Sequence, residues 1–239
     1  VTTVESQPGK LESLLTDHSI TSLKVTGTID ARDFKFIADN LLALSEIDLS
    51  EATIAAYCDE ETATFGADNN FAAASIPCTS FFGKSITSVM LPASVKSIGF
   101  AAFAGCDQLT TIAFPASLDS ISGYAFSGSG LTSVELPASV KTVGEGAFAR
   151  CENLESATVG SENIGKDAFY ADAALAALTL NKEVKTIGDG AFKSCSALTG
   201  INIEGSALES IGNEAFAYTS ISALDLSAQK SLKTVGGWA

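Results

Sequence analysis

Apolar and polar positions alternate over short stretches of the chain, and the whole arrangement then repeats at a longer interval. In LTSVELPASV, residues 131–140, Val134 and Leu136 are two positions apart, with Ser133 and Glu135 beside them. Because successive side chains of a strand point to opposite faces, this stretch predicts a short strand with one buried and one exposed face. The expected inward set of one unit is Leu131, Val134, Leu136, Val140, Val143, Phe148, Cys151 and Leu154.

The same order of apolar positions returns along most of the chain. The segments SIGFAAFAGC, SISGYAFSGS, TVGEGAFARC, NIGKDAFYAD, TIGDGAFKSC and SIGNEAFAYT share one frame, and IPCTSFFGKS extends it towards the N-terminus. Their shared phenylalanines are Phe81, Phe103, Phe126, Phe148, Phe169, Phe192 and Phe216, at intervals of 21 to 24 residues. Units of this length are too short to fold alone, so each is expected to be one coil of a solenoid.

Stacking is expected to stabilise these coils. One coil cannot enclose eight inward side chains, so neighbouring coils bury one another's apolar surface and pair their strands about 4.8 Å apart in a parallel sheet. Gly144, after the second apolar pair, fits a tight turn, and the GxxAF segment allows one or two helical turns at most. The pattern predicts a right-handed leucine-rich-repeat solenoid, α/β or mostly β, with a parallel sheet on one face and short strands, turns and short helices on the other.

The repeat also carries a family resemblance. The stretch LTSVELPASVKTVGEGAFARCENL fits the frame LxxLxLPxxVxxIGxxAFxxC and resembles the repeat of the BspA-like leucine-rich-repeat proteins, a family of bacterial surface proteins. Residues 20–54 resemble the non-repetitive opening of many members. The resemblance implies an exported chain at the cell surface or outside the cell, and for some members an adhesive role towards host matrix proteins.

Three regions are expected within one continuous domain. Residues 1–54 form an N-terminal cap, 55–75 an irregular insertion loop where one coil falls out of frame, and 76–239 the tandem repeats. In the cap, the stretch ARDFKFIADNLLAL has apolar residues three or four apart, as a helix requires, and Asp30 is placed to cap its N-terminus. The last repeat, LKTVGGWA, stops one position before its expected phenylalanine, so we expect it to be truncated.

Composition and charge argue against several functional classes. The 28 acidic and 14 basic residues give a net charge of −14, which repels phosphate backbones and anionic lipid headgroups. We therefore expect no nucleic-acid partner and no direct membrane insertion. The single histidine, His18, is interpreted as a surface or cap residue, and no CxxC, HxxxH, GxxxxGK[ST] or GxGxxG pattern occurs. No cofactor, metal site or enzymatic activity is expected.

Three cysteines occupy one slot of the repeat, three residues after the phenylalanine, and we call it the cysteine slot. These are Cys106, Cys151 and Cys195, while the slot holds Lys84, Ser129, Asp172 and Thr219 in the other repeats. Two coils would separate the thiols by roughly 10 Å, beyond the roughly 7 Å limit between the Cα atoms of a disulfide. Like the phenylalanines, these cysteines are predicted to be buried structural residues.

Two features near the irregular segment have alternative interpretations. Cys58 and Cys78 border the segment and are either bridged or free. The acidic run 59–70 is either a solvated loop or a source of oxygen ligands for calcium, although it lacks DxDxDG spacing. Its candidate ligands are Asp59, Glu60, Glu61, Asp68, Asn69 and Asn70.

The exposed face of the predicted sheet is the candidate binding surface, because extended sheet faces are the usual docking surfaces of solenoids. Its candidate ligand-binding residues are Asp48, Met90, Glu135, Thr158, Thr179, Asn202 and Asp225, with Lys24 and Ala113 in the same row. The row is small, polar and mildly acidic, without aromatic platforms or basic clusters. Glu135 and Asp225 would lie roughly 19 Å apart, too far for the paired carboxylates of a glycoside hydrolase.

The patterns favour a monomeric, non-catalytic binding scaffold, and the family resemblance implies that it lies at the bacterial surface. It would engage a protein, such as a host extracellular-matrix protein, or a glycan through the sheet face. Two alternatives remain at this point. One is a structural spacer or stalk that presents a domain outside this chain, and the other is that a single face residue serves only solubility.

Overall fold

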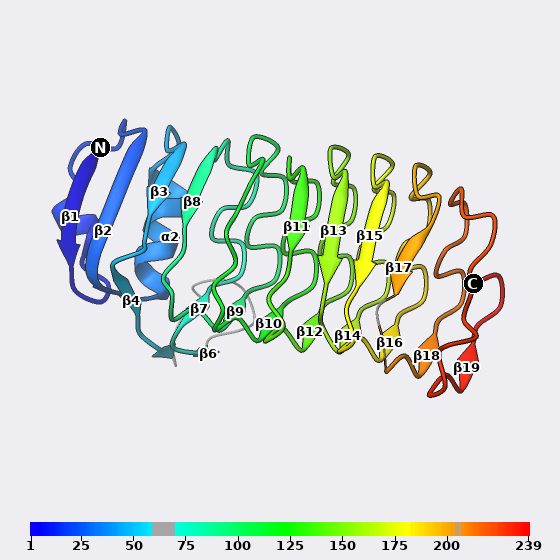
Figure 1. Ribbon diagram of the computed structural model, residues 1–239. Helices are drawn as coiled ribbons and strands as arrows, with labels where there is room; N and C mark the ends of the chain where they lie inside the picture. The colour runs from blue at the N-terminus through cyan, green and yellow to red at the C-terminus, as the bar shows by residue number, and fades with distance from the viewer. Residues whose placement is uncertain (59–69, 204, 206) are drawn as a thin grey trace.

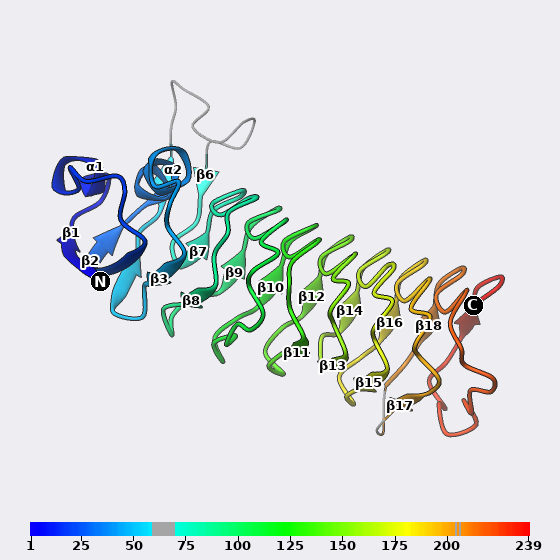
Figure 2. The same cartoon turned by 90° about the horizontal axis from the view of Figure 1, so that it is seen from above.

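The fold is a solenoid of about 10 coils whose strands form two rows along its length (Figure 1). The computed structural model describes residues 1–58, 70–203, 205 and 207–239. Seen from above, successive coils step along one axis from the N-terminal to the C-terminal end (Figure 2). The leucine-rich-repeat solenoid predicted from the sequence is confirmed.

Each row of strands has a defined order. The first row consists of β1 (Thr2–Ser6), β2 (Ser22–Ile29), β3 (Glu46–Asp48), β8 (Ser88–Met90), β11 (Ser133–Glu135), β13 (Ser156–Val159), β15 (Ala177–Leu180) and β17 (Ile201–Ile203). The second row consists of β7 (Ser75–Ile76), β9 (Ser97–Ile98), β10 (Ser120–Ile121), β12 (Thr142–Val143), β14 (Asn163–Ile164), β16 (Thr186–Ile187), β18 (Ser210–Ile211) and β19 (Thr234–Val235). The second row is one continuous parallel sheet, whereas the first divides into two parallel sheets between β8 and β11.

A column of phenylalanines runs through the core between the rows. The rings from Phe81 to Phe216, one per coil, lie with centroids 5.0 to 5.4 Å apart and planes within 2 to 12° of parallel. At the N-terminal end, Phe34 packs edge-on against Phe81 at 6.1 Å. Aromatic pairs contribute roughly 0.5–1.5 kcal/mol beyond the burial of their surface, so the column links the coils from Phe81 to Phe216 to one another.

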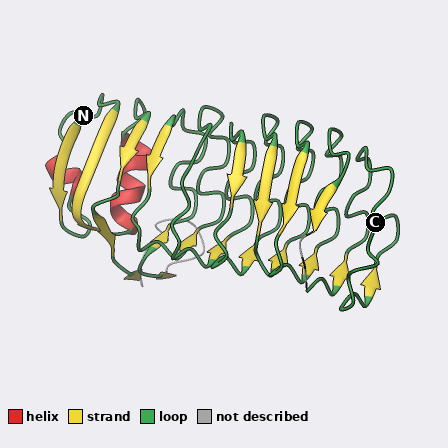
Figure 3. Cartoon of the chain, viewed as in Figure 1, coloured by secondary structure: helices red, strands yellow, loops and turns green. Residues whose placement is uncertain are grey.

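The N-terminal end holds both helices of the described chain, α1 (Leu11–Leu14) and α2 (Ala31–Asn40) (Figure 3). The Asp30 side chain accepts a hydrogen bond from the Arg32 amide at 2.9 Å, and the Asp33 carboxylate accepts one from the Asp30 amide at 2.9 Å. This reciprocal capping box fixes the start of α2, as the cap prediction at Asp30 required. The helix ends at Asn40, short of the full amphipathic stretch.

The segment predicted to be irregular lies next to this end. β4 (Ala52–Ile54) pairs with β2, and β5 (Tyr57–Cys58) pairs antiparallel with β6 (Asn70–Phe71). Residues 59–69 of the acidic run, with the calcium-ligand candidates except Asn70, lie outside the described residues. The Cys58 thiol is unbridged, so the disulfide to Cys78 is absent from this structure.

Glycine is required at Gly165 and Gly188, where consecutive coils approach each other after the second row. A Cβ atom on Gly165 would lie 2.7 Å from the carbonyl carbon of Gly144 and from the Val143 carbonyl oxygen. The same holds for Gly188 against the backbone of Gly165, at 2.6 Å. At these positions a side chain is therefore excluded by the closeness of the backbones.

The GxxAF segments form turns where the sequence allowed one or two helical turns. Gly146 and Arg150 adopt left-handed φ angles of 60° and 61°, which interrupt a right-handed helix. The amides of Gly146, Phe148 and Arg150 donate to carbonyl groups of the next coil at 2.8 to 2.9 Å. Alternate amides thus link this side of the solenoid across coils, in place of the hydrogen bonds within a helix.

Candidate binding surface

The solvent-facing residues of the first row of strands have the register that the sequence predicted. Lys24 lies opposite Asp48, which in turn lies opposite Met90. In the second part of the row, Glu135, Thr158, Thr179 and Asn202 are consecutive neighbours. These seven residues therefore share one face, in two groups.

A gap between β8 and β11 divides this face. Residues 110–114, in the coil between them, form no strand, although LTTIAFPASL fits the strand pattern. Phe114 takes the position held by Leu91 and Leu136 in neighbouring coils, and its ring lies edge-on to Phe126 and Phe148, at 5.6 and 6.4 Å. Ala113 is exposed beside it, so the predicted row is broken at this coil.

A hollow opens on the face at this gap, and we call it the sheet-face hollow. Its volume is about 330 Å³, and it is lined by Ile112, Ala113, Phe114, Glu135, Leu136 and Pro137. Ile112 and Phe114 are half-buried, so apolar surface remains accessible there, while the Glu135 carboxylate is exposed at the rim. The hollow combines an apolar lining with one negative charge.

The N-terminal part of the face carries a compact group of charges. The Lys24 ammonium lies 3.5 Å from the Asp48 carboxylate and 2.5 Å from that of Glu51. The hydrogen bond to Glu51 raises the pKa of Lys24, and the Ser50 hydroxyl, which donates to Asp48 at 2.6 Å, lowers the pKa of that carboxyl group. Met90 stands next to this group with half of its surface exposed.

Asp225 differs from the other predicted face residues. It is exposed, but residues 221–226 form no strand, so its place in the paired row is not realised. Its carboxylate accepts a hydrogen bond from the Ser227 amide at 2.9 Å, and the Ser227 side chain and amide lower its pKa. Asp225 therefore caps a local turn next to the end of the row.

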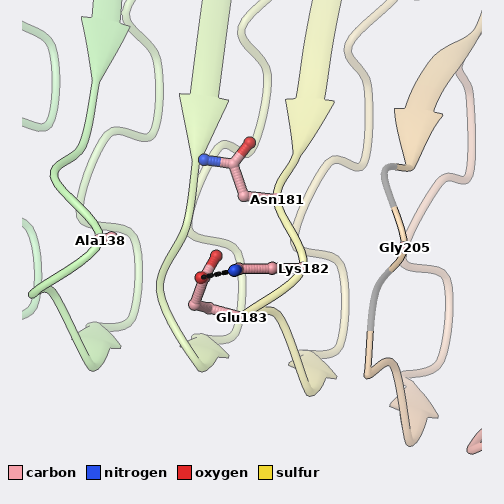
Figure 4. Close-up of a pocket in the computed structure, with 5 residues that line it drawn as sticks. All are labelled: Ala138, Asn181, Lys182, Glu183 and Gly205. Carbon is pink, nitrogen blue, oxygen red and sulfur yellow. Dashed lines mark ion pairs between the residues drawn. The ribbon is translucent and has the colours of Figure 1, made fainter.

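A second hollow, which sequence reasoning missed, lies beyond the ends of the first-row strands (Figure 4). It has a volume of about 540 Å³ and is lined by Ala138, Asn181, Lys182, Glu183 and Gly205. A shortened coil accounts for it: Val143 follows Leu136 by seven positions, but Ile164 follows Val159 by only five. The signal was present in the sequence as the shortest phenylalanine interval, 21 residues.

The repeat now permits comparison with known proteins. The profile of the BspA-type leucine-rich-repeat region matches residues 74–169 and 162–239, in six copies. The chain belongs to the BspA-type leucine-rich-repeat family. A search of curated proteins found no match.

Solved structures similar to this chain include three bacterial leucine-rich-repeat proteins. The TpLRR protein of T. pallidum is 28% identical, with a TM-score of 0.58 over 69% of this chain and 79% of that chain. A protein from Eubacterium ventriosum is 16% identical, with a TM-score of 0.62 over 91% and 57% of the two chains. One from Bacteroides ovatus is 18% identical, with a TM-score of 0.50 over 91% and 75%. The last two likenesses show the fold.

The slot cysteines of this BspA-type chain are buried and unbridged. The thiols of Cys106, Cys151 and Cys195 donate to carbonyl groups of the preceding phenylalanine-bearing coils at 3.0 to 3.2 Å. Burial raises the pKa of each thiol to about 12. Reactive cysteines are partly exposed and have lowered pKa values, so these three have the opposite environment.

The described part of the chain offers no centre for metal chemistry. Among those residues, no group of three His, Cys, Asp or Glu side chains is placed to hold a metal ion. His18 lies exposed in a turn, with its ring edge-on to Phe36 at 5.4 Å. No helix in the described ranges is long and apolar enough to cross a membrane.

Proposed function

We propose that this BspA-type chain is a non-catalytic binding scaffold that docks a protein partner on its first-row sheet face. The sheet-face hollow carries the proposal, because it places accessible apolar surface beside an exposed charge in the middle of an extended face. Hot spots of protein interfaces are apolar anchors seated in pockets and surrounded by polar contacts. A partner side chain seated against the half-buried Ile112 and Phe114 would form such an anchor.

The open shape of the face also favours a protein partner. A stable interface covers about 800 Å² on each partner, which an extended row of strands supplies and a single hollow does not. Glu135 and the chain's net charge of −14 favour a partner whose contact surface is basic around an apolar side chain. Host extracellular-matrix proteins are the partner class that the family resemblance suggests.

The lack of catalysis is proposed from the same geometry. The carboxylates on this face stand on an open surface, without walls that exclude water from a reacting pair. The location is proposed from the family, whose members include bacterial surface proteins, and implies export of the chain. We further propose that it acts as a monomer.

The proposal is tested by surface plasmon resonance against a panel of purified extracellular-matrix proteins. Glu135→Lys reverses the charge at the rim of the sheet-face hollow, and Glu152→Lys makes the same change at an exposed position of the same coil, away from the row. Charges at an interface rim act mainly on association. The Glu135→Lys variant should therefore associate more slowly and with a weaker dependence on salt, whereas Glu152→Lys should behave as the wild type.

Two results would count against docking on this face. One is an equal loss of binding in both variants, which would place the contact elsewhere or make it a general charge effect. The other is the absence of binding across the whole panel at physiological salt. That outcome, together with a functional domain adjoining this region in the intact protein, would support the spacer function.

A further inference from the structure

Two exposed aromatic rings lie side by side beyond the ends of second-row strands, away from the proposed docking face. Phe100 follows β9 and Tyr124 follows β10, which are neighbours in that row (Figure 1). Their ring centroids are 5.7 Å apart at an angle of 68°. Phe100 is 54% exposed and Tyr124 39% exposed, unlike the buried aromatic column. We call these two residues the aromatic pair.

Each ring of the aromatic pair is seated on a glycine of the next coil. A Cβ atom on Gly123 would lie 3.6 Å from Cδ2 of Phe100, and one on Gly146 would lie 2.5 Å from Cε1 of Tyr124. A side chain at Gly146 would therefore displace the Tyr124 ring. With the glycine backbone against one side, both rings are held in place and keep accessible surface on the other side.

Hydrogen-bond donors and acceptors border the aromatic pair. The Tyr124 hydroxyl donates to Oε1 of Glu145 at 3.3 Å, and the Lys166 ammonium lies 3.6 Å from the same oxygen. Lys166 also lies 3.7 Å from the Asp167 carboxylate. The Glu145 charge raises the pKa of Tyr124, so its hydroxyl remains a donor. A ligand bound over the rings would therefore have hydrogen-bond donors and acceptors within reach.

We propose that the aromatic pair, with Glu145 and Lys166, is a binding site for a neutral oligosaccharide. A pyranose ring presents C–H groups polarised by neighbouring oxygens, and these are attracted to the negative face of an aromatic ring. Its hydroxyl groups both donate and accept, which matches the carboxylate and ammonium groups at the border. Two adjacent rings suit consecutive sugar units of one chain.

Other partners fit this site less well. The net charge of −14 and the carboxylates of Glu145 and Asp167 oppose sulfated or uronic-acid glycans and nucleic acids, even though aromatic rings also stack on bases. A protein partner would need about 800 Å² of complementary surface, far more than two side chains provide. The site does not overlap the sheet-face hollow, so its test is independent of the test of the proposed function.

The test is titration of the intact chain with cellohexaose, mannohexaose and chitohexaose, followed by saturation-transfer NMR and calorimetry. A shallow two-ring site is expected to bind one or more of these sugars with a Kd on the order of 1 mM. Phe100→Ala and Tyr124→Ala should each weaken binding by roughly tenfold. Tyr218→Ala removes an exposed aromatic from another coil and is the matched control, expected to bind as the wild type.

The titrations distinguish results that support the oligosaccharide site from results that overturn it. Loss of binding in both pair variants, with unchanged circular dichroism and an unaffected Tyr218→Ala control, supports the site. Absence of binding for all three neutral sugars overturns the proposal. So does binding that both pair variants retain, or binding only to a heparin oligosaccharide run in parallel.

Discussion

Asp172 provides a sharp test of how the cysteine slot contributes to stability. Its side chain is fully buried in the position that holds cysteine in three other coils. Oδ1 accepts a hydrogen bond from the Cys151 amide at 2.8 Å, but Oδ2 has no hydrogen-bond partner among the described residues. A buried polar atom without a partner costs about 1–3 kcal/mol. Asp172→Cys would remove this cost.

The expected change in the free energy of unfolding on Asp172→Cys is the balance of the hydrogen bonds gained and lost. Cysteine in this slot can donate to the carbonyl of the column phenylalanine one coil earlier, as Cys195 does to Phe169 at 3.1 Å. The substitution also removes the hydrogen bond from the Cys151 amide, which is worth about 0.5–1.5 kcal/mol. The net expectation at pH 7 is a gain of about 1 kcal/mol in the free energy of unfolding. Ser129→Cys is the control, because the Ser129 hydroxyl already lies 3.3 Å from the Cys151 sulfur; its effect should be smaller.

The ionisation of Asp172 gives a second, independent signature. Burial raises the pKa of Asp172 well above its usual range in the folded chain. Below the unfolded-state pKa of about 3.9, the carboxyl is protonated in both states and imposes no pH-dependent cost. As the pH rises above that value, the unfolded chain releases the proton first. Stability then falls by up to about 1.4 kcal/mol per pH unit until the folded pKa is passed.

The assay is urea denaturation followed by circular dichroism at a series of pH values between 4 and 8. Asp172→Asn retains an acceptor for the Cys151 amide but cannot ionise, so it should lack the decline attributed to Asp172. Two results would refute the reasoning. One is a lower stability of Asp172→Cys than of the wild type at pH 7, and the other is a parallel pH dependence in the wild type and Asp172→Asn.

Two further predictions concern packing and thiol chemistry. Gly165→Ala should lower the free energy of unfolding by about 1–3 kcal/mol through overpacking, whereas Gly200→Ala, with no atom within 4 Å of the new Cβ, should change it little in the same urea titration. In the native chain at pH 8, Ellman's reagent should modify the exposed Cys58 but reach Cys106, Cys151 and Cys195 only on unfolding, because they are buried with pKa values of about 12. Modification of a slot cysteine at the rate of Cys58 would contradict this.

The sequence predicted those features that depend on which side chains point inward. The frame of the repeat placed Glu135, Thr158, Thr179 and Asn202 in one row, and the pairing of their strands has that register. It also set one phenylalanine per coil at the centre. Inward-pointing positions are readable because a strand's side chains alternate and a solenoid repeats them.

Features that depend on how closely backbones approach were not predictable in the same way. LTTIAFPASL fits the strand frame, yet residues 110–114 form no strand and the sheet-face hollow lies beside them. Asp225 fits the frame as well and lies outside any strand. The pattern identifies the face of a residue but not whether the neighbouring coil is near enough for a hydrogen bond.

The aromatic pair was missed for a different reason. Phe100 and Tyr124 occupy positions that vary between repeats, and variable positions carry no information in an alignment of copies. A usable signal existed across coils: each aromatic residue is followed, one unit later, by a glycine at the matching position, Gly123 and Gly146. Such a cross-coil pairing becomes meaningful only once the solenoid places the two residues in contact.

The regular spacing of the phenylalanine column determines how the solenoid can change in length. Each ring of the column stacks on the column rings before and after it, 5.0 to 5.4 Å away, so adding or removing one coil changes the length of the column by one ring spacing. Gain or loss of whole repeats would therefore lengthen or shorten the rod in steps of one ring spacing. The number of coils would then set both the length of the rod and the extent of the sheet face that it displays.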